Sequence, residues 1–600
     1  MSSSNSGEIG FSVTAGSHKL DHTQYPFFII ETENKIGKVP HAVLQIHDGA
    51  VDQQDFPISD SKVLQVGQEI TIEAGYHNAL KPIFKGIIVR QSIRSTRQAP
   101  SMLVLECKDT AYRTTLVPKH RSFGGTSAAP GLRDDKIIKE VLSTYSHLSA
   151  SVASTAVAHE TLIQPGISDW DFINLRAEAN GMIVLVESGT VKVKKPNDKQ
   201  AATRSFAYGQ DILEFDLHMD VRAQIKGVEG HAWDTQKKAV RNIKASEPGE
   251  RSFGSISYSK LASFHQQPPL TLRHGANVSK QELETVAGSV LTSSRLAKVQ
   301  GFITVEGHAE TQPDQVVHIE KSAQAFQGAA YVTGVRHHLS EGEWTTQLTF
   351  GLPPTRYMHR YQDIAALPSA GITPPLHGLQ IGLVKKTLGD PQKGHRIFVH
   401  IPLVHGPQEG IWCRMASLYA SQDCGMVFTP EAEDEVVLGF IDGDPRHPVV
   451  VGSLYSPLNK PPVVNKEDTA LKTIVSHSKL TIEFDDKDKV ITLSTPNKQQ
   501  IKISEKDHSI ELINAEAGRV VLNEKCVEVF SKKDISLHAQ GALTLQAGDN
   551  IQIKAGKALN MTGSNVSAKA SMKASLSGKS SAELQSSATT IVKGMIVKIN

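Results

Sequence analysis

Cysteine is scarce in this sequence of 600 residues. The four cysteines are Cys107, Cys413, Cys424 and Cys526. No two of them form a CxxC pair, and the His-x-x-x-His spacing at His18 and His22 lies far from all of them. A structural zinc site usually contains closely spaced cysteines, and four cysteines are too few to form a disulfide framework in so long a chain, so the sequence argues against both and we expect no metal. Because free thiols are typical of reducing compartments, we expect a chain that folds in the cytoplasm.

Long apolar runs are also missing. The longest, such as 27–30 and 449–451, are far too short to span a bilayer. The first residues, MSSSNSGEIGFSV, contain neither the basic region nor the apolar core of a secretory signal. We therefore expect a protein without a signal peptide that is cytoplasmic during assembly. If it leaves the cell, it does so by a route that reads no cleavable signal.

An excess of one charge is absent as well. The chain has 64 basic and 62 acidic side chains, a formal net charge of +2. This balance argues against nucleic acid as a partner of the whole chain. A chain of this length exceeds a single hydrophobic core, so we expect about three to five domains.

Most of the chain predicts short strands. Apolar and polar residues alternate from residue 8 to about 115, for example in 43–47 and 70–74, with glycine and Asn/Asp between the segments. A second strand-rich region follows at about 205–367 and includes predicted strands at 212–220 and 221–228. Many short strands at even spacing favour small barrels or sandwiches.

Three helices are predicted within this β-rich part. One opens at Asp134, and a second begins at Ser168 and ends at Asn180-Gly181, a favourable left-handed C-terminus. Between the second helix and residue 200, the turn Ser188-Gly189 predicts a hairpin. The third helix begins after Ser279. In each case apolar residues recur at the spacing of one helical face.

A proline-containing linker at 367–375 marks a boundary. About 85 residues beyond it predict five strands with glycine-rich connections, at 379–385, 396–401, 411–416, 435–441 and 449–454. Five such strands fit an OB-type barrel. Ligand binding by this barrel would need aromatic residues among basic ones, and it offers only Phe398, Trp412 and Tyr419.

The chain after about residue 468 is different in kind. Predicted strands and turns alternate every eight to ten residues. The strands are expected at 480–484, 490–494, 500–504, 509–514, 519–522, 527–530, 535–539, 543–547 and 551–554. No proline follows Pro496, and no Phe, Tyr or Trp follows Phe530. A disordered Ser/Lys-rich tail is the alternative for the last sixty residues. The persisting apolar alternation instead favours a narrow shaft in which three copies intertwine, because one copy would leave long strand edges unpaired.

Three segments resemble VgrG and the hub-and-spike proteins of contractile phage tails and extracellular injection particles. They are 162–186, LIQPGISDWDFINLRAEANGMIVLV; 329–351, AAYVTGVRHHLSEGEWTTQLTFG; and 435–462, EVVLGFIDGDPRHPVVVGSLYSPLNKPP. The resemblance covers nearly the whole chain. It implies a mainly β homotrimer in which tandem hub barrels with a few helices precede an OB-fold barrel and an intertwined triple-stranded β-helix.

This resemblance also implies domain bounds. A hub domain would span 1–370, with barrel subdomains at about 8–120 and 205–367 and a helical and stranded insertion at about 130–200. An OB-fold domain would span 371–462, and a β-helical needle 463–600.

The implied function is that of a puncturing device, a spike that caps the inner tube and is secreted or driven into a target cell. Expected partners are a homotrimer, an Hcp-like tube hexamer, baseplate proteins, effectors or adaptors, the target membrane on firing, and a PAAR-like tip protein. The tip protein would dock on Lys598, Ile599 and Asn600. A type VI secretion spike, an extracellular injection-particle spike and a phage baseplate hub remain open as alternatives.

Several residues that resemble functional sites have simpler interpretations. Asp442 and Asp444 are typical of a turn, although carboxylates also bind metals. His337 and His338 are adjacent on a predicted strand and would face opposite ways. Cys413 and Cys424 are predicted to be buried free thiols.

Catalysis is not expected, and neither is a cofactor. No GxSxG, HExxH or P-loop motif stands where it would matter, and fewer than about twenty residues separate Pro462 from the first clear needle strand. That is too short for a muramidase domain with paired carboxylates. A β-helix polysaccharide-degrading enzyme is the enzyme alternative, although such solenoids lack a preceding hub and barrel.

Overall fold

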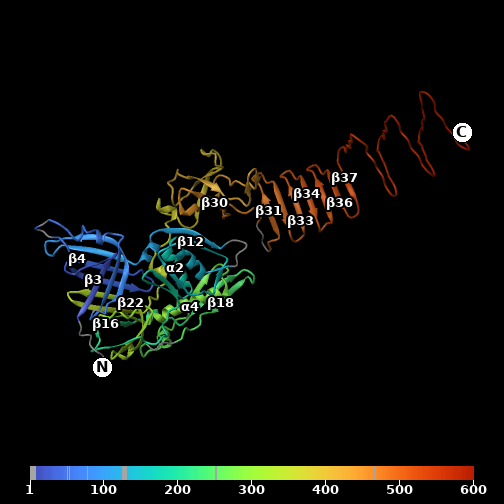
Figure 1. Ribbon diagram of the computed structural model, residues 1–600. Coiled ribbons are helices and arrows are strands. Elements are labelled where there is room, and N and C mark those ends of the chain that lie inside the picture. The colour runs from blue at the N-terminus through green and yellow to red at the C-terminus, as the bar shows by residue number, and fades with distance from the viewer. Residues whose placement is uncertain are drawn as a thin grey trace. The chain divides into compact units, whose positions relative to one another are not determined.

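A computed structural model describes residues 8–49, 52, 54–77, 79–124, 131–249, 253–463 and 468–599. The chain divides into two compact units, Met1–Ser453 and Leu454–Asn600. Strands are the main regular structure in both units (Figure 1). Among the described residues, no helix is long and apolar enough to cross a membrane.

The first strand-rich region is one antiparallel run of strands over a shared core. Its strands are β1 (Ile9–Ala15), β2 (His18–Lys19), β3 (Phe27–Lys35), β4 (His41–His47), β5 (Glu69–Tyr76), β6 (Lys81–Arg94) and β7 (Met102–Lys108). They pair in the order β3-β4-β7-β6-β5-β1-β2. In β4, Ala42, Leu44 and Ile46 are fully buried and the residues between them are partly exposed. The alternation read from the sequence is therefore confirmed as a strand with one buried face.

The insertion that follows has its own core. Its elements are β8 (Pro118–Gly124), β9 (Leu132–Arg133), α1 (Asp134–Ser143), β10 (Ser149–Val152), β11 (Ala158–His159), β12 (Thr161–Ser168), α2 (Asp169–Ala179), β13 (Ile183–Glu187) and β14 (Thr190–Lys194). Ser168 caps α2 by accepting a hydrogen bond from the backbone N–H of Asp171 at 3.1 Å. Ser188 and Gly189 both have positive φ, as the tight hairpin between β13 and β14 requires. The two predicted helices and this hairpin are confirmed.

Asp169 is a fully buried carboxylate that ties α2 to β8. Its oxygens accept hydrogen bonds from Lys119 Nζ and Tyr145 OH at 2.7 Å each, and from Gln164 Nε2 at 2.8 Å. Arg121 Nη2 lies 2.7 Å from both oxygens. Burial alone raises the pKa of Asp169, but the hydrogen bonds from Lys119, Gln164 and Tyr145 outweigh it and lower the pKa overall.

A second buried carboxylate, Asp134, ties the first turn of α1 to α2. Arg176 donates to it in a bidentate pair at 2.6 and 3.0 Å, and Asn180 Nδ2 donates at 2.8 Å. His159 Nε2 lies 3.1 Å from the same carboxylate. Because both buried charges are paired and hydrogen-bonded, they fix how the helices pack.

The second strand-rich region contains most of the remaining helices. Its elements are β15 (Ser205–Ala207), β16 (Ile212–Met219), β17 (Val228–Asp234), β18 (Ala239–Lys244), α3 (Tyr258–Ser263), β19 (Leu270–His274), α4 (Lys280–Leu296), β20 (Val299–Glu306), β21 (Val316–Glu320), β22 (Gly328–Ser340), β23 (Glu343–Phe350) and α5 (Tyr357–Arg360). α4 is capped by Ser279 and packs on the sheet β18-β17-β19.

Two local predictions in this region differ from the structure. The predicted strand 221–228 is wrong: Val221–Ala223 is a 3-10 turn, because the Asp220 carboxylate accepts from the backbone N–H of Arg222 at 2.9 Å. The short helix α3 was not predicted. Its six residues are too few to show a helical period, and only the cap at Ser257 marks its start.

The two strand-rich regions are joined, although the sequence predicted separate barrels. β22 pairs with β23 and β21 of its own region and also with β3 of the first, from Gly334↔Lys35 to Ser340↔Ile29. The result is one thirteen-stranded sheet in the described residues. β22 has thirteen residues and is therefore long enough to pair with strands of both regions. The sequence pattern alone does not show this double pairing.

β22 also carries a buried histidine at this junction. His337 is 3% exposed, and its Nδ1 lies 3.0 Å from Thr346 Oγ1. Burial lowers the pKa of His337 to about 3, and the nearby His308 adds a smaller effect in the same direction. The folded protein therefore keeps His337 neutral at pH values at which the unfolded chain protonates it.

We expect this histidine to make stability fall in acid. Protonation of the unfolded chain begins near pH 6.5, so the free energy of unfolding should drop from that pH downward until about pH 3. Between pH 7 and pH 5 the loss from this one residue is about 2 kcal/mol. Urea unfolding of the wild type and His337→Asn at both pH values measures it. Equal pH dependence in the two proteins would contradict the expectation.

Residues 380–453 form a closed five-stranded barrel. β24 (Gln380–Lys386), β25 (Ile397–His400), β26 (Ile411–Met415), β30 (Pro448–Ser453) and β29 (Glu435–Phe440) pair in that order around the ring. All five predicted strands are confirmed. Its core includes Val384, Val399 and Cys413, each fully buried. A small hairpin of β27 (Ala420–Ser421) and β28 (Cys424–Gly425) forms a separate sheet.

The second unit contains one seven-stranded sheet. Its strands are β31 (Leu471–Val475), β32 (Thr481–Asp485), β33 (Val490–Ser494), β34 (Gln500–Ser504), β35 (Ser509–Ile513), β36 (Arg519–Asn523) and β37 (Val527–Phe530). Each pairs antiparallel with the next along the chain. The six predicted strands between residues 480 and 530 are confirmed, and β31 precedes them.

Candidate functional site

The C-terminal sheet has one face made almost entirely of aliphatic side chains. Its pairing register aligns them in two rows that cross the sheet. One row is Ile474, Ile482, Leu493, Ile501, Leu512, Val520 and Val529, and the other is Phe484, Ile491, Ile503, Ile510, Leu522 and Val527. We call these two rows the aliphatic face. Every strand from β32 to β37 contributes to both rows, and β31 contributes Ile474.

This face is open to solvent in the single chain. Ile491, Leu493, Ile501 and Ile503, at its centre, are between 38% and 45% exposed. Soluble proteins seldom leave a contiguous apolar surface of this extent uncovered. The aliphatic face is therefore a candidate interaction surface.

The opposite face of the same sheet is mostly polar, although Leu471, Val490, Ile513 and Val521 also lie on it. Glu483, Thr492, Lys502 and Glu511 follow one another across four strands in a single register row. Exposed ion pairs such as Lys489–Glu505 at 3.1 Å lie at the turns. Because they are exposed, these pairs contribute little stability.

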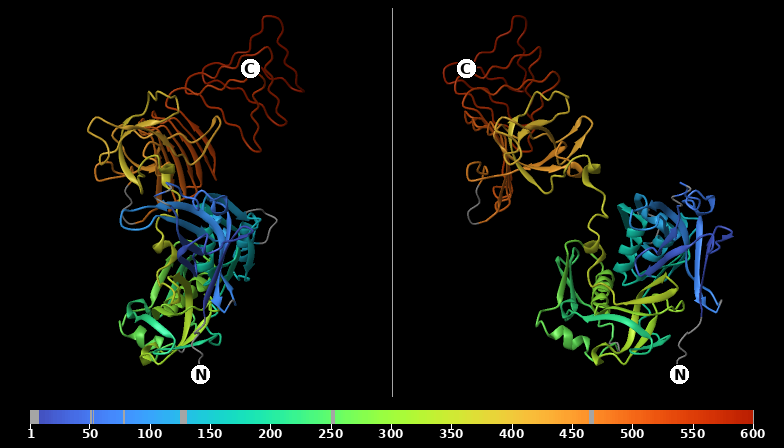
Figure 2. Two further views of the ribbon diagram at one scale, coloured as in Figure 1. Left: turned by 60° about the vertical axis from the view of Figure 1, so that its left-hand side comes forward. Right: turned by 90° about the vertical axis from the view of Figure 1, so that its left-hand side faces the viewer.

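Residues 531–599 contain no strand within one chain, so the predicted strands at 535–539, 543–547 and 551–554 are wrong for the single chain. Along this described segment the backbone makes no hydrogen bond to the rest of the described chain. Bends nevertheless recur about every eight residues, at 532–533, 540–541, 548–549, 556–557, 564, 571–572, 579–580, 587–588 and 595–596. Both views in Figure 2 show this red segment as repeated turns without arrows. A strand needs a neighbouring ladder, and one copy does not supply it here.

Apolar pairs follow the same period. Ile535 and Leu537, Leu543 and Leu545, and Ile551 and Ile553 occupy the same place in successive repeats. Every one of these side chains is more than half exposed. Ala539, Ala547 and Ala555 follow two residues after each pair. The aliphatic pattern of the sheet thus continues in a segment that has no partner within the chain.

The predicted tip residues lie at the end of this segment. Lys598 and Ile599 are exposed, and Asn600 lies outside the described residues. Docking of a tip protein on them stays a prediction.

In the barrel, Phe398 and Trp412 pack against each other with ring centroids 5.4 Å apart, while Tyr419 is exposed. Cys413 is buried as predicted. Cys424 is exposed, so its predicted burial is wrong. It lies on the separate hairpin β27–β28, which has no inner face to bury it.

The aspartates and histidines that could suggest metal sites have other partners. Asp442 Oδ2 accepts from the backbone N–H of Ser369 at 2.9 Å, and Asp444 forms a bidentate pair with Arg446 at 2.9 and 2.6 Å. Among the described residues, no group of three or more His, Cys, Asp or Glu side chains is placed to hold a metal.

Three of the histidines likewise contact neighbouring residues of the fold, and one is exposed. His338 Nδ1 lies 3.0 Å from Glu31 Oε1, so it and the buried His337 face opposite sides of β22 as predicted. His22 Nε2 lies 3.1 Å from the Phe11 carbonyl oxygen, and His18 is exposed on β2.

Comparison with known proteins agrees with this architecture. Residues 5–341, more than half of the chain, match the family described as "Alg8 N-terminal domain". Residues 380–455 match the "Type VI secretion system/phage-baseplate injector OB domain". The chain is also 26% identical over 414 residues to the type VI secretion system spike protein VgrG5 of Pseudomonas aeruginosa. The chain belongs to the Alg8 N-terminal domain family and is VgrG-like. The description of that family names a domain and no activity.

The matches to individual relatives are partial. The VgrG5 match covers 61% of this VgrG-like chain and 50% of the relative. A second match, to the spike protein VgrG2a of the same organism, is 29% identical over 122 residues and covers 19% of this chain and 14% of the relative. The chain therefore spans half or less of the length of these curated spike proteins.

Two solved structures are similar over more than half of the chain. A tail protein of Neisseria meningitidis matches with 16% identity and a TM-score of 0.43, covering 57% of this chain and 96% of that one. An E. coli component of the type VI secretion system, similar in structure to the phage T4 tail proteins gp27 and gp5, has 11% identity and a TM-score of 0.35, covering 74% and 99%.

Sequence reasoning found the alternation on which the aliphatic face rests but missed its two rows. Alternation assigns a side chain to one side of its own strand, whereas the rows depend on cross-strand register. The buried clusters around Asp134 and Asp169 were also missed, because their partners come from distant positions such as Lys119 and Arg176.

Proposed function

We propose that this VgrG-like protein acts as a homotrimeric spike of a contractile injection machine and pierces a target envelope mechanically. The aliphatic face is the observation that carries the proposal. One copy leaves this face in water, whereas three copies turned inward would bury it around a common axis. Burial at about 25 cal/mol per Å² of apolar surface would favour assembly strongly.

Copies of the same chain fit this face better than an unrelated partner. The side chains in each row are separated by the regular spacing of the strands. A second copy of the chain has the same rows with the same spacing, so its side chains can align with them. The outer edges of β31 and β37 are unpaired within the sheet, as are the repeats of residues 531–599. Intertwined chains would supply the missing ladders, and such edges are otherwise prone to aggregation.

The composition of residues 531–599 suits a shaft. Its repeats lack aromatic side chains and place alanine or glycine after most apolar pairs. Small residues let three chains approach closely near the axis. To bend such a shaft, many backbone hydrogen bonds between strands would have to break at once. The shaft would therefore be stiff, as mechanical penetration requires.

The proposal extends to the partners. The trimer would cap an Hcp-like tube hexamer, contact baseplate proteins, carry effectors or adaptors, and seat a PAAR-like tip protein on Lys598, Ile599 and Asn600. It would be cytoplasmic during assembly and reach the outside or a target cell on firing. We propose no catalytic step for it, in keeping with curated relatives that are named as spike proteins. A spike of an extracellular particle or a phage hub would use the same surfaces.

Light scattering with negative-stain imaging tests this function. We expect a mass near three times 65.1 kDa and a particle with a thin shaft. Deleting 468–600 should remove the shaft and lower the proportion of trimer. A stable 65.1 kDa monomer with a long solenoid would overturn the proposal and favour the β-helix enzyme.

A further inference from the structure

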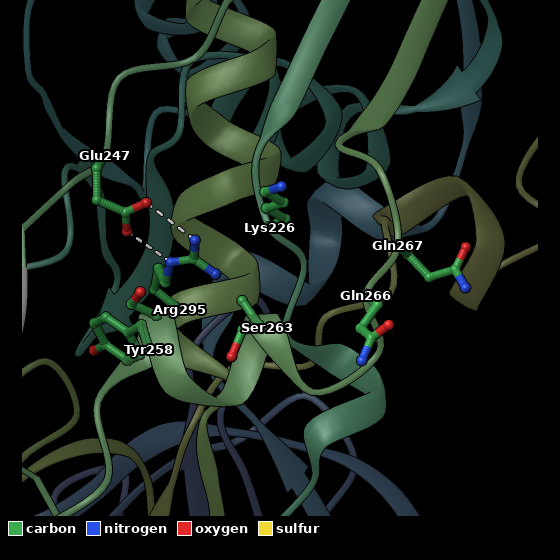
Figure 3. Close-up of a pocket in the computed structure, with 9 residues that line it drawn as sticks. Lys226, Glu247, Tyr258, Ser263, Gln266, Gln267 and Arg295 are labelled. Atoms are coloured by element: carbon green, nitrogen blue, oxygen red, sulfur yellow. Dashed lines mark hydrogen bonds and ion pairs between the residues drawn. The ribbon is translucent and has the colours of Figure 1, made fainter.

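The first unit contains a groove whose charged and buried polar groups have no role in the proposed spike function. It consists of two hollows of about 560 and 350 Å³ that share Lys226, Ala262 and Gln267. Helix α3 and the loop after it form one wall, and the segment before β17 forms another. We call the two hollows the α3 groove, and Figure 3 shows the residues that line the larger one. Volumes of this size are typical of ligand-binding pockets.

Among the described residues, one exposed cation that lines the groove has no carboxylate partner. Arg295 is 3% exposed and is held by Glu247 in a bidentate pair at 2.6 and 3.0 Å. Arg222 is paired with Asp220 in the same way. Lys226 has no ion pair among the described residues, and it lines both hollows. Figure 3 shows Lys226 between the Glu247–Arg295 pair and Gln267.

Two buried polar atoms also lack partners. Gln224 lines the smaller hollow and is 2% exposed. Its amide nitrogen donates to the carbonyl of Ser294, but its Oε1 has no hydrogen-bond partner among the described residues. His265 Nε2, in the same hollow, is likewise buried without one. A buried acceptor left unpaired is unfavourable, so a ligand that donates a hydrogen bond to it gains affinity.

The rest of the lining is mixed: Ser259, Ser263, Gln266 and Gln267 are polar, and the other residues are apolar or lie at an open strand edge. Tyr258 and Ala262 line the larger hollow, and Ile225, Pro268 and Leu270 line the smaller one. Leu270 is also the first residue of β19, an outer strand of the sheet β18-β17-β19. An outer strand leaves backbone N–H and C=O groups for an extended chain to pair with.

We propose that the α3 groove binds an extended peptide segment that carries a carboxylate. The carboxylate pairs with Lys226, a backbone N–H of the peptide donates to Gln224 Oε1, and an apolar side chain packs on Tyr258 and Ala262. A neutral apolar peptide would leave Lys226 unpaired, and a free anion would leave the apolar wall and Gln224 unused. The groove is thus a docking site for an acidic tail or loop of a partner protein, distinct from the aliphatic face.

Fluorescence anisotropy on the full chain tests this proposal. The probe is a panel of labelled pentapeptides made in matched pairs, with Glu in one member and Gln in the other. We expect acidic members to bind and their Gln counterparts to bind at least about tenfold more weakly, the size of one hydrogen bond to a charged group. Lys226→Ala should weaken the acidic members by a similar factor and abolish the difference within each pair.

Lys260→Ala is the matched control, because Lys260 lies on α3 but lines neither hollow. It should leave binding unchanged. Gln224→Leu should weaken both members of each pair, and if that variant does not fold, Lys226→Ala alone decides. The proposal is overturned if no peptide binds at about 1 mM, if Glu and Gln members bind equally, or if Lys260→Ala weakens binding as much as Lys226→Ala. Light scattering on Lys226→Ala, expected to show the wild-type mass, separates this outcome from a failure of trimer formation.

Discussion

Leu493→Asp is expected to abolish assembly of the C-terminal shaft. Leu493 lies at the centre of the aliphatic face, between Ile482 and Ile501 on the neighbouring strands. In a trimer with this face inward, the substitution places three carboxylates together in an apolar interior. Each would cost several kcal/mol unless it were protonated, and the three would also repel one another. Light scattering should show the mass falling toward 65.1 kDa.

Thr492→Asp is the matched control for this experiment. Thr492 precedes Leu493 in β33 and points to the polar face, between Glu483 and Lys502 in its register row. The same charge added there should leave the mass unchanged. If Leu493→Asp retains the wild-type mass, or if Thr492→Asp lowers it equally, the aliphatic face is not the assembly surface.

Asp169→Ala is expected to destabilise the first unit strongly. Its removal leaves Lys119 and Arg121 without the carboxylate they share, and leaves Tyr145 and Gln164 without an acceptor. Breaking a buried ion pair from one side typically costs about 3–5 kcal/mol. Urea unfolding followed by near-ultraviolet circular dichroism would measure the change in the free energy of unfolding.

The exposed pair of Asp220 and Arg222 supplies the comparison. Arg222 Nη2 lies 2.7 Å from Asp220 Oδ2, the same distance as Lys119 Nζ from Asp169 Oδ2. The Arg222 side chain, however, is 85% exposed. Arg222→Ala should therefore change the unfolding midpoint little, because an exposed pair is screened by water and the Asp220 cap on the backbone N–H of residue 222 stays in place. Equal losses in the two variants would show that burial of Asp169 is not what makes its network important.

Much of the fold could be predicted from local patterns. The caps at Ser168 and Ser279, the turn at Ser188-Gly189 and the five strands of the barrel each depend on residues within one short segment. Their physics is local: a side-chain oxygen satisfies a helix N–H, a positive φ fits a tight hairpin, and alternation separates a buried from an exposed face. The VgrG-like character was also visible in short stretches such as 435–462.

The sequence by itself therefore determined that this is a mainly β protein with a barrel and a repetitive, aromatic-free C-terminal segment. Only the tertiary structure decided that β22 joins both strand-rich regions, that Asp169 gathers Lys119 and Arg121, and that the aliphatic side chains form two continuous rows. Lys226 and Gln224 lie two residues apart, yet only the placement of α3 beside them makes a groove. Strand register and long-range packing depend on contacts between segments that are far apart in the sequence. No single stretch of sequence determines those contacts.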